Sequence, residues 1–347
     1  MLGLGCKSTS LDPSLFFFRE GDSLSGIIVS HIDDFLHCGN TSFQEKVVDK
    51  LCTRFCAGSK QSEEFKYVGY QVVQKNGVIS INQHDYIANA EIPQLQFNPG
   101  GGKEDVLSDK DVTSFRSMVG MLNWVVQSTR PDLAFDMVDL STRFKCAKIE
   151  DLKRVKKIVT KLRSEKSEIV FPDLGPFSTW KLAVFSDASF GNLSGGVDSC
   201  GGFLIFLSAK CKSCPIVWKS GRVQRVVKST LAAEGLSLSE ALDEAIYVRH
   251  VLCQIFSVPS KSEYFAITGI TDHEGLCRNI RSTKLVEDRR LRLDIASIKQ
   301  NIARGEVSEV ILCSSGEQLA DVLTKKGVSG DKLLSVLQTG GSLGCQI

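Results

Sequence analysis

The feature that most constrains the fold is a long helical stretch, Thr230–Phe256, placed between strand-like runs. Three such runs precede it and one follows, at 181–186, 201–207, 215–218 and 264–271. An apolar stripe recurs along the helix at helical spacing and must face a sheet: Leu238, Ala241, Ala245, Val248 and Leu252. A helix of this length lets the fourth strand cross over and lie parallel to the first. We therefore predict a mixed α/β sheet flanked by helices.

The remainder of this half follows the same alternation. Two helical stretches come next, then a strand at Val307–Cys313 and a last helix beginning at Glu317. Two Cys residues, Cys211 and Cys214, fall where a hairpin tip is expected, and no second pair or nearby histidine completes a zinc site. Without an export signal, we expect all 12 cysteines to be reduced.

The N-terminal half has shorter elements. Residues 26–37 read as a hairpin that turns at Asp33-Asp34, and a helix follows at Ser42–Phe55. Strands at 65–73 and 78–81 are joined by a turn at Lys75-Asn76-Gly77, and residues 96–105 read as a loop. The segments 113–146 and 151–163 are mostly helical, with a break at Arg130-Pro131 because the residue before proline avoids the helical region.

Length and composition limit the function classes. At about 150 residues per domain, 347 residues suggest two units, which we place at 1–172 and 173–340 because the pattern changes after Pro172. No apolar stretch approaches the ~18 residues of a membrane span, so we expect no membrane partner and a cytoplasmic location, or one in a nucleus or virus-like particle. The net charge of +2 does not itself imply a polyanion partner.

Four carboxylates in the second unit lie at positions where a solvent-exposed charged side chain is not expected. Asp187 closes the first strand and Asp272 the fourth, so parallel neighbours would bring both to one sheet edge. Glu234 lies on the apolar stripe and points inward, and Asp321 lies between apolar neighbours near the start of the last helix. Each aspartate could instead be an ordinary turn residue, and Glu234 could instead interact with the positive end of the helix dipole.

Clustered carboxylates repel each other unless cations bind. Hard oxygen ligands suit Mg²⁺ or Mn²⁺, and two ions about 3.5–4 Å apart could activate a water and stabilise a departing 3′ oxygen. The pattern therefore indicates metal-dependent hydrolysis of a phosphodiester.

The motifs that surround these residues resemble the ribonuclease H domain of copia-type retrotransposon Pol polyproteins. They are Phe185–Ser189, Ser229–Glu234, Thr271–His273, Leu319–Lys325 and the basic helix Glu287–Ile295. The resemblance implies a ribonuclease H-like α/β fold and makes Asp187, Glu234, Asp272 and Asp321 the metal ligands. Gly235 stands where an aromatic residue is usual, and His273 where an asparagine is expected.

The first unit resembles the end of a reverse transcriptase from the same kind of polyprotein. His31-Ile-Asp-Asp34 is similar to its paired-aspartate hairpin, Phe65–Gly69 to the next strand, and Phe115–Gly120 with Thr129–Asp132 to the segment before the ribonuclease. Polymerase chemistry needs a further aspartate on an earlier palm strand, which this sequence lacks. We therefore expect Asp33 and Asp34 to be vestigial and this half not to polymerise.

Two groups of basic residues could contact nucleic acid. One lies between the third strand and the long helix and includes Arg222, Arg225 and Lys228, and the other includes Arg289 and Arg290. A solvated charged face is an equal alternative because no aromatic residues interleave with them. The choice of an RNA–DNA hybrid as substrate follows from the resemblance alone.

We therefore predict a retrotransposon-derived ribonuclease H that cuts the RNA strand of RNA–DNA hybrids, attached to an incomplete reverse transcriptase and able to associate with other parts of a Pol polyprotein. One rival is a decayed or domesticated remnant that binds nucleic acid without cutting it. Another is a different nuclease or strand-transfer enzyme on the same sheet, since a fold does not fix a function.

Overall fold

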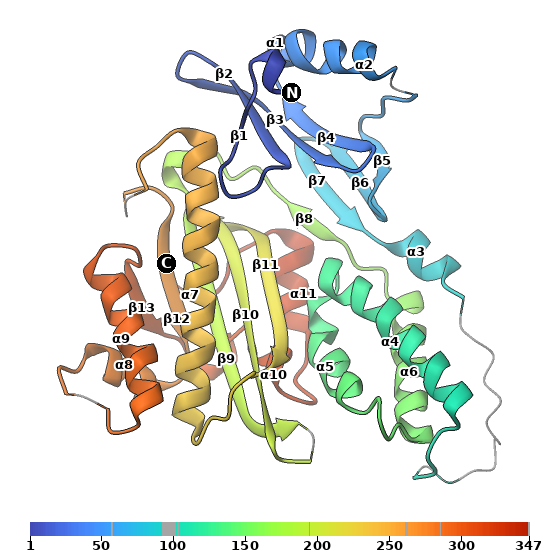
Figure 1. Cartoon of the computed structure of the whole chain (residues 1–347), viewed down its shortest axis with the longest axis vertical. Coiled ribbons are helices and arrows are strands. Elements are labelled where there is room, and N and C mark those ends of the chain that lie inside the picture. Colours follow the sequence, from blue (N-terminus) through green and yellow to red (C-terminus); the bar gives the residue numbers. More distant parts are fainter. Residues whose placement is uncertain are drawn as a thin grey trace.

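A computed structural model describes residues 1–56, 58–91, 102, 104–193, 195–260, 263–284 and 286–345. Its strands form three sheets, and the largest lies in the C-terminal half with helices on both faces (Figure 1). Within these ranges, no helix combines the length and apolarity required to cross a bilayer.

The first sheet carries the predicted hairpin. Its order is β1(Lys7–Ser8), β2(Leu15–Glu20), β3(Ser23–His31) and β4(Asp34–Gly39), and β3 and β4 confirm the hairpin around Asp33. The predicted helix is also confirmed, as the continuous segments α1(Thr41–Phe43), η2(Gln44–Val48) and α2(Asp49–Phe55). Phe43 from this helix is fully buried against Gly26 and Gly39, where a side chain would collide with its ring.

The second sheet corrects one prediction. Its order is β5(Glu64–Tyr67), β6(Tyr70–Lys75), β7(Val78–Asn82) and β8(Ile169–Phe171). The single strand predicted at 65–73 is wrong, because the chain turns at Val68 and Gly69, which have φ values of 47° and 81°. Valine rarely adopts that conformation, so Val68 itself did not indicate a turn. The turn predicted at Lys75–Gly77 is confirmed.

Helices then lead to the main sheet. They are α3(His84–Asn89), α4(Asp109–Ser128), the short η3(Pro131–Leu133), α5(Ala134–Thr142) and α6(Ile149–Ser164), so the break at Arg130-Pro131 is confirmed. The loop predicted at 96–105 lies largely outside the described residues.

The main sheet has the order β11-β10-β9-β12-β13. Its strands are β9(Lys181–Leu193), β10(Asp198–Ala209), β11(Lys212–Arg222), β12(Ala266–Thr271) and β13(Glu309–Leu312). The first three are antiparallel, whereas β12 is parallel to both β9 and β13. The α/β ribonuclease H-like fold class is therefore confirmed, including the parallel crossover, and Cys211 lies in the turn between β10 and β11.

Helices cover both faces of this sheet (Figure 1). On one face, α7(Thr230–Phe256), α8(Glu274–Arg281) and α9(Arg289–Ala303) bury Leu182 and Val184 of β9. On the other face, the alternate residues Ala183 and Phe185 share a core with α4 to α6, α10(Asp321–Thr324) and α11(Asp331–Thr339). The two predicted units thus pack through one core, and the boundary at 172/173 stays a prediction.

Two details near the site differ from expectation. The strand that carries Asp187 does not end there but continues to Leu193. The last helix does not run on from Glu317, because η5(Ser315–Glu317), α10 and α11 are separate elements. The helix α10 ends before Lys325, whose backbone is extended, so Asp321 stands at the start of a short helix. Gly327, with a φ of 77°, lies in the connection that follows, before α11.

Candidate metal centre and nucleic-acid interface

Asp187 and Asp272 reach one place because β9 and β12 are parallel. Ile270 pairs with Phe185, and each aspartate follows its member of that pair by two residues along the chain. Asp187 is completely buried within β9, and Asp272 is half-buried just after β12. His273, the next residue, accepts a hydrogen bond at Nδ1 from the backbone N–H of Leu276, 3.0 Å away, and so begins α8.

Glu234 is held against the sheet by its helix. Ser229 caps α7 by accepting from the backbone N–H of Ala232, and Ala233 is fully buried, so the helix approaches closely. The Ser237 hydroxyl then donates to the carbonyl oxygen of Asp187 at 3.0 Å. Glu234 consequently points to the sheet and is only 4% exposed.

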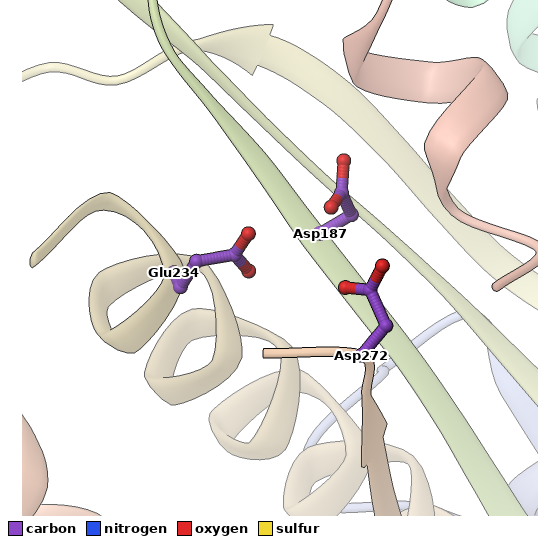
Figure 2. A group of neighbouring side chains, drawn as sticks. All are labelled: Asp187, Glu234 and Asp272. Carbon is purple, nitrogen blue, oxygen red and sulfur yellow. The ribbon is translucent and has the colours of Figure 1, made fainter. Parts of the chain in front are cut away.

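Figure 2 shows the three carboxylates converging from β9, α7 and the end of β12. One oxygen atom from each of Asp187, Glu234 and Asp272 lies within 4.8 Å of the others. In the described part of the chain, Glu234 Oε2 is buried without a hydrogen-bond partner. Burial, followed by the charges of Asp187 and Asp272, raises the pKa of Glu234 to about 9. A divalent cation would relieve both the missing contact and the repulsion, so these donors fit Mg²⁺ or Mn²⁺.

Asp321 lies outside that group of three and is linked to Asp187 by the ion pairs that Lys325 makes with both residues. Lys325 Nζ lies 3.1 Å from Asp187 Oδ1 and 2.6 Å from Asp321 Oδ1. Thr324 donates its hydroxyl to Asp187 Oδ2. Burial raises the pKa of Asp321. The hydrogen bond from Lys325 lowers this pKa but does not outweigh burial. Burial lowers the pKa of Lys325, but the hydrogen bond to Asp321 and the charge of Asp187 outweigh it and leave a raised pKa.

Four further residues shape the site and were not predicted from the sequence: Lys325, Thr324, Ser237 and Gly202. Lys325 follows Asp321 at the i,i+4 spacing of helical ion pairs, and that spacing was the available signal. Gly202 lies opposite Asp187, and a Cβ there would come within 2.8 Å of Leu323. The departure at Gly235 also has a packing reason, since a Cβ at that position would lie 2.9 Å from Leu291 Cδ1.

The paired aspartates of the first unit lie apart from this centre in the sequence and in a different sheet. Asp33 lies in the turn between β3 and β4, and Asp34 begins β4. Both are exposed and line a cavity of about 380 Å³ with His37 and Lys60. Among the described residues, no third acidic or metal-ligating side chain joins these two aspartates in a cluster. Their vestigial role stays a prediction.

The structure brings the two predicted basic groups together. Arg225, before α7, pairs with Asp294 of α9, and Arg290 donates to the carbonyl oxygen of Val226 at 3.4 Å. Arg222 is paired with Asp198 at 3.3 Å. Lys228 and Arg289 are exposed. The five residues thus lie on adjoining segments, and their contact with nucleic acid stays a prediction.

The chain is similar in sequence to proteins of known transposons. No family model matches the chain. A retrovirus-related Pol polyprotein from transposon RE1 of Arabidopsis thaliana is 24% identical over 94% of this chain. The chain is similar to retrotransposon Pol polyproteins. It spans 22% of that relative's length. A transposon Ty5-1 protein of Saccharomyces cerevisiae is 25% identical over 66% of this chain and 76% of its own length.

Solved structures align more distantly. Ribonuclease H1 of the archaeon Halobacterium salinarum covers 42% of this chain and 94% of its own at 13% identity, with a TM-score of 0.29. A foamy viral protease–reverse transcriptase in complex with double-stranded DNA covers 82% of this chain and 55% of its own at 13% identity, with a TM-score of 0.21. The fold assignment rests on the strand order and directions of the main sheet. The expected kinship with retrotransposon Pol polyproteins is confirmed, and its copia type stays a prediction.

Proposed function

We propose that this chain contains the ribonuclease H of a copia-type retrotransposon Pol polyprotein, which cuts the RNA strand of an RNA–DNA hybrid with Mg²⁺ or Mn²⁺. The observation that carries the proposal is the convergence of Asp187, Glu234 and Asp272 around a buried carboxylate oxygen without a partner in the described chain. The similarity to Pol polyproteins over 94% of the chain supports the same conclusion.

The four carboxylates would act together as metal ligands in this mechanism. Asp187, Glu234 and Asp272 would hold the ions, with Asp321 completing the set from the side of Asp187. Ions bound there would supply positive charge beside the scissile phosphate and would lower the pKa of a bound water. Burial and the neighbouring acidic side chains raise the pKa of Glu234 and so favour its protonated form. Glu234 would lose this proton on binding a metal ion.

The surrounding protein keeps these ligands in place. Ser237 ties α7 to the Asp187 backbone, and the β9–β12 register fixes Asp187 beside Asp272. Such preorganisation avoids the cost of assembling the acidic groups during the reaction. Asp187 lies on a strand, Glu234 lies on a helix, and Asp272 directly follows a strand, and such elements hold side chains more rigidly than long loops would.

The basic segments around Lys228 and Arg289 would lie along the phosphate backbone of the hybrid. Lysine and arginine contacts to phosphate supply affinity without reading sequence. We propose the hybrid as substrate from the similarity to Pol polyproteins, and we propose other parts of such a polyprotein as further partners.

A cleavage assay tests this function. The purified chain is incubated with Mg²⁺ and a hybrid labelled on the RNA strand, beside matched duplex DNA and duplex RNA. We expect the hybrid's RNA strand to be cut, and Asp187→Asn or Glu234→Gln to reduce the rate at least about 100-fold, because each change removes an anionic ligand. Binding without cutting would favour a nucleic-acid-binding remnant, and equal cutting of duplex DNA would favour a different nuclease.

A further inference from the structure

The two sides of the acidic cluster differ in how well their oxygen atoms are satisfied. On one side, Asp187 Oδ1 accepts from Lys325 and Asp187 Oδ2 accepts from Thr324. On the other side, Glu234 Oε2 has no hydrogen-bond partner among the residues described. The cluster is therefore divided into a side that already holds a positive charge and a side that lacks one.

Lys325 holds that charge between two acidic side chains. The Lys325 ammonium nitrogen lies 2.6 Å from Asp321 Oδ1 and 3.1 Å from Asp187 Oδ1. The side chain of Asp187 is completely buried. A divalent cation shared by the same two carboxylates would have to approach the same oxygen atoms. The ammonium and that cation repel each other at such short separation, so both cannot occupy the space between Asp187 and Asp321.

We propose that Lys325 is a built-in cation that restricts the centre to one tightly bound divalent ion. The first ion binds on the side of Glu234 and Asp272, and a second binds between Asp187 and Asp321 only after Lys325 moves away. This inference rests on the proposed metal centre.

The geometry allows both states of the lysine. The side chain is 36% exposed, so its ammonium group has a route to solvent. Asp187 remains available to the first ion, because each carboxylate oxygen can accept two partners. A lysine stem with four rotatable carbons can withdraw without any change in the backbone.

Manganese titration of the full chain tests the inference. Bound Mn²⁺ is counted by electron paramagnetic resonance and its affinity is measured by calorimetry, for the wild type, Lys325→Gln and Lys325→Arg. Lys326→Gln is the matched control, since Lys326 is the exposed neighbouring lysine. We expect one tight ion in the wild type and in both Lys325→Arg and Lys326→Gln. Lys325→Gln should bind a second ion at least about tenfold more tightly, because a like charge has been removed.

The outcomes separate this inference from the proposed function. If the wild type binds an ion that Glu234→Gln abolishes, but Lys325→Gln matches the wild type in stoichiometry and affinity, the metal centre stands and the role of Lys325 is wrong. If neither the wild type nor Lys325→Gln binds Mn²⁺, both proposals are wrong.

A second measurement needs no variant and so does not depend on whether Lys325→Gln folds. An amine-reactive reagent is added to the wild type at increasing Mn²⁺ concentration, and labelling of each lysine is followed by mass spectrometry. Labelling of Lys325 should rise as the second ion binds, while labelling of Lys326 stays constant. Labelling of Lys325 that is unchanged at saturating Mn²⁺ would contradict the inference.

Discussion

Gly202 lies directly opposite Asp187 across the β9–β10 pair, and its missing side chain leaves the space that α10 fills. A Cβ at Gly202 would come within 2.8 Å of Leu323 Cβ and 3.0 Å of Thr324 Cγ2. The segment that carries Asp321 and Lys325 can therefore approach Asp187 because residue 202 is glycine.

Gly202→Ala should displace Leu323 and Thr324 from β10. We expect the free energy of unfolding to fall by about 1–3 kcal/mol, the usual cost of overpacking a core. The cleavage rate should fall as well, because the same segment carries Asp321, which would be displaced from its place beside Asp187. Denaturant unfolding and the hybrid assay measure the two effects. Gly221→Ala is the control, since a Cβ there has open space, and equal effects of the two changes would contradict this account.

The raised pKa of Glu234 predicts how the stability of metal-free protein depends on pH. Its carboxyl group has a pKa of about 9 when folded, against an ordinary value of 4.5. Between these values unfolding releases a proton, so this contribution to stability is fully present below pH 4.5 and is lost as the pH rises towards 9. The slope is at most about 1.4 kcal/mol per pH unit.

Glu234→Gln removes this titration. Urea unfolding in the presence of a chelator, at several pH values between 5 and 8, should show the variant gaining stability relative to the wild type as the pH rises. Parallel pH dependence in the two proteins would show that Glu234 does not keep its proton in the folded state.

The exposed basic residues near α9 should contribute to affinity for nucleic acid. In an Asp187→Asn background, which prevents cleavage, Lys228→Ala and Arg289→Ala should each weaken hybrid binding and reduce the slope of log affinity against log salt by about 1. Lys157→Ala on α6 is the control, as Lys157 is also exposed. Salt slopes unaltered by Lys228→Ala and Arg289→Ala would place the nucleic acid on another face.

The sequence was sufficient to predict the main sheet because its signals were periodic and local. The bounds of α7 agree with the helical stretch Thr230–Phe256, and the parallel placement of β12 beside β9 follows from the length of that crossover helix. The convergence of Asp187 and Asp272 could be inferred for the same reason, since strand direction determines which ends meet.

What could not be predicted depended on contacts between distant segments. The placement of Lys325 between Asp187 and Asp321 requires the close approach of α10 to β10. That approach depends on Gly202, a strand glycine that no sequence motif marks. The turn at Val68 was missed because valine favours strands, whereas Val68 adopts a φ of 47° in the structure. Short elements such as β1 and β8 carry too few residues for a periodic signal.

The central claim is that Asp187, Glu234 and Asp272 together bind a divalent cation, and a crystal of the protein soaked in manganese chloride tests it most directly. The account predicts an anomalous scattering peak about 2.0–2.5 Å from oxygen atoms of all three carboxylates. In crystals of Glu234→Gln that peak should weaken or vanish. A soaked wild-type crystal with no peak between these side chains, at a manganese concentration that supports cleavage, would contradict the account.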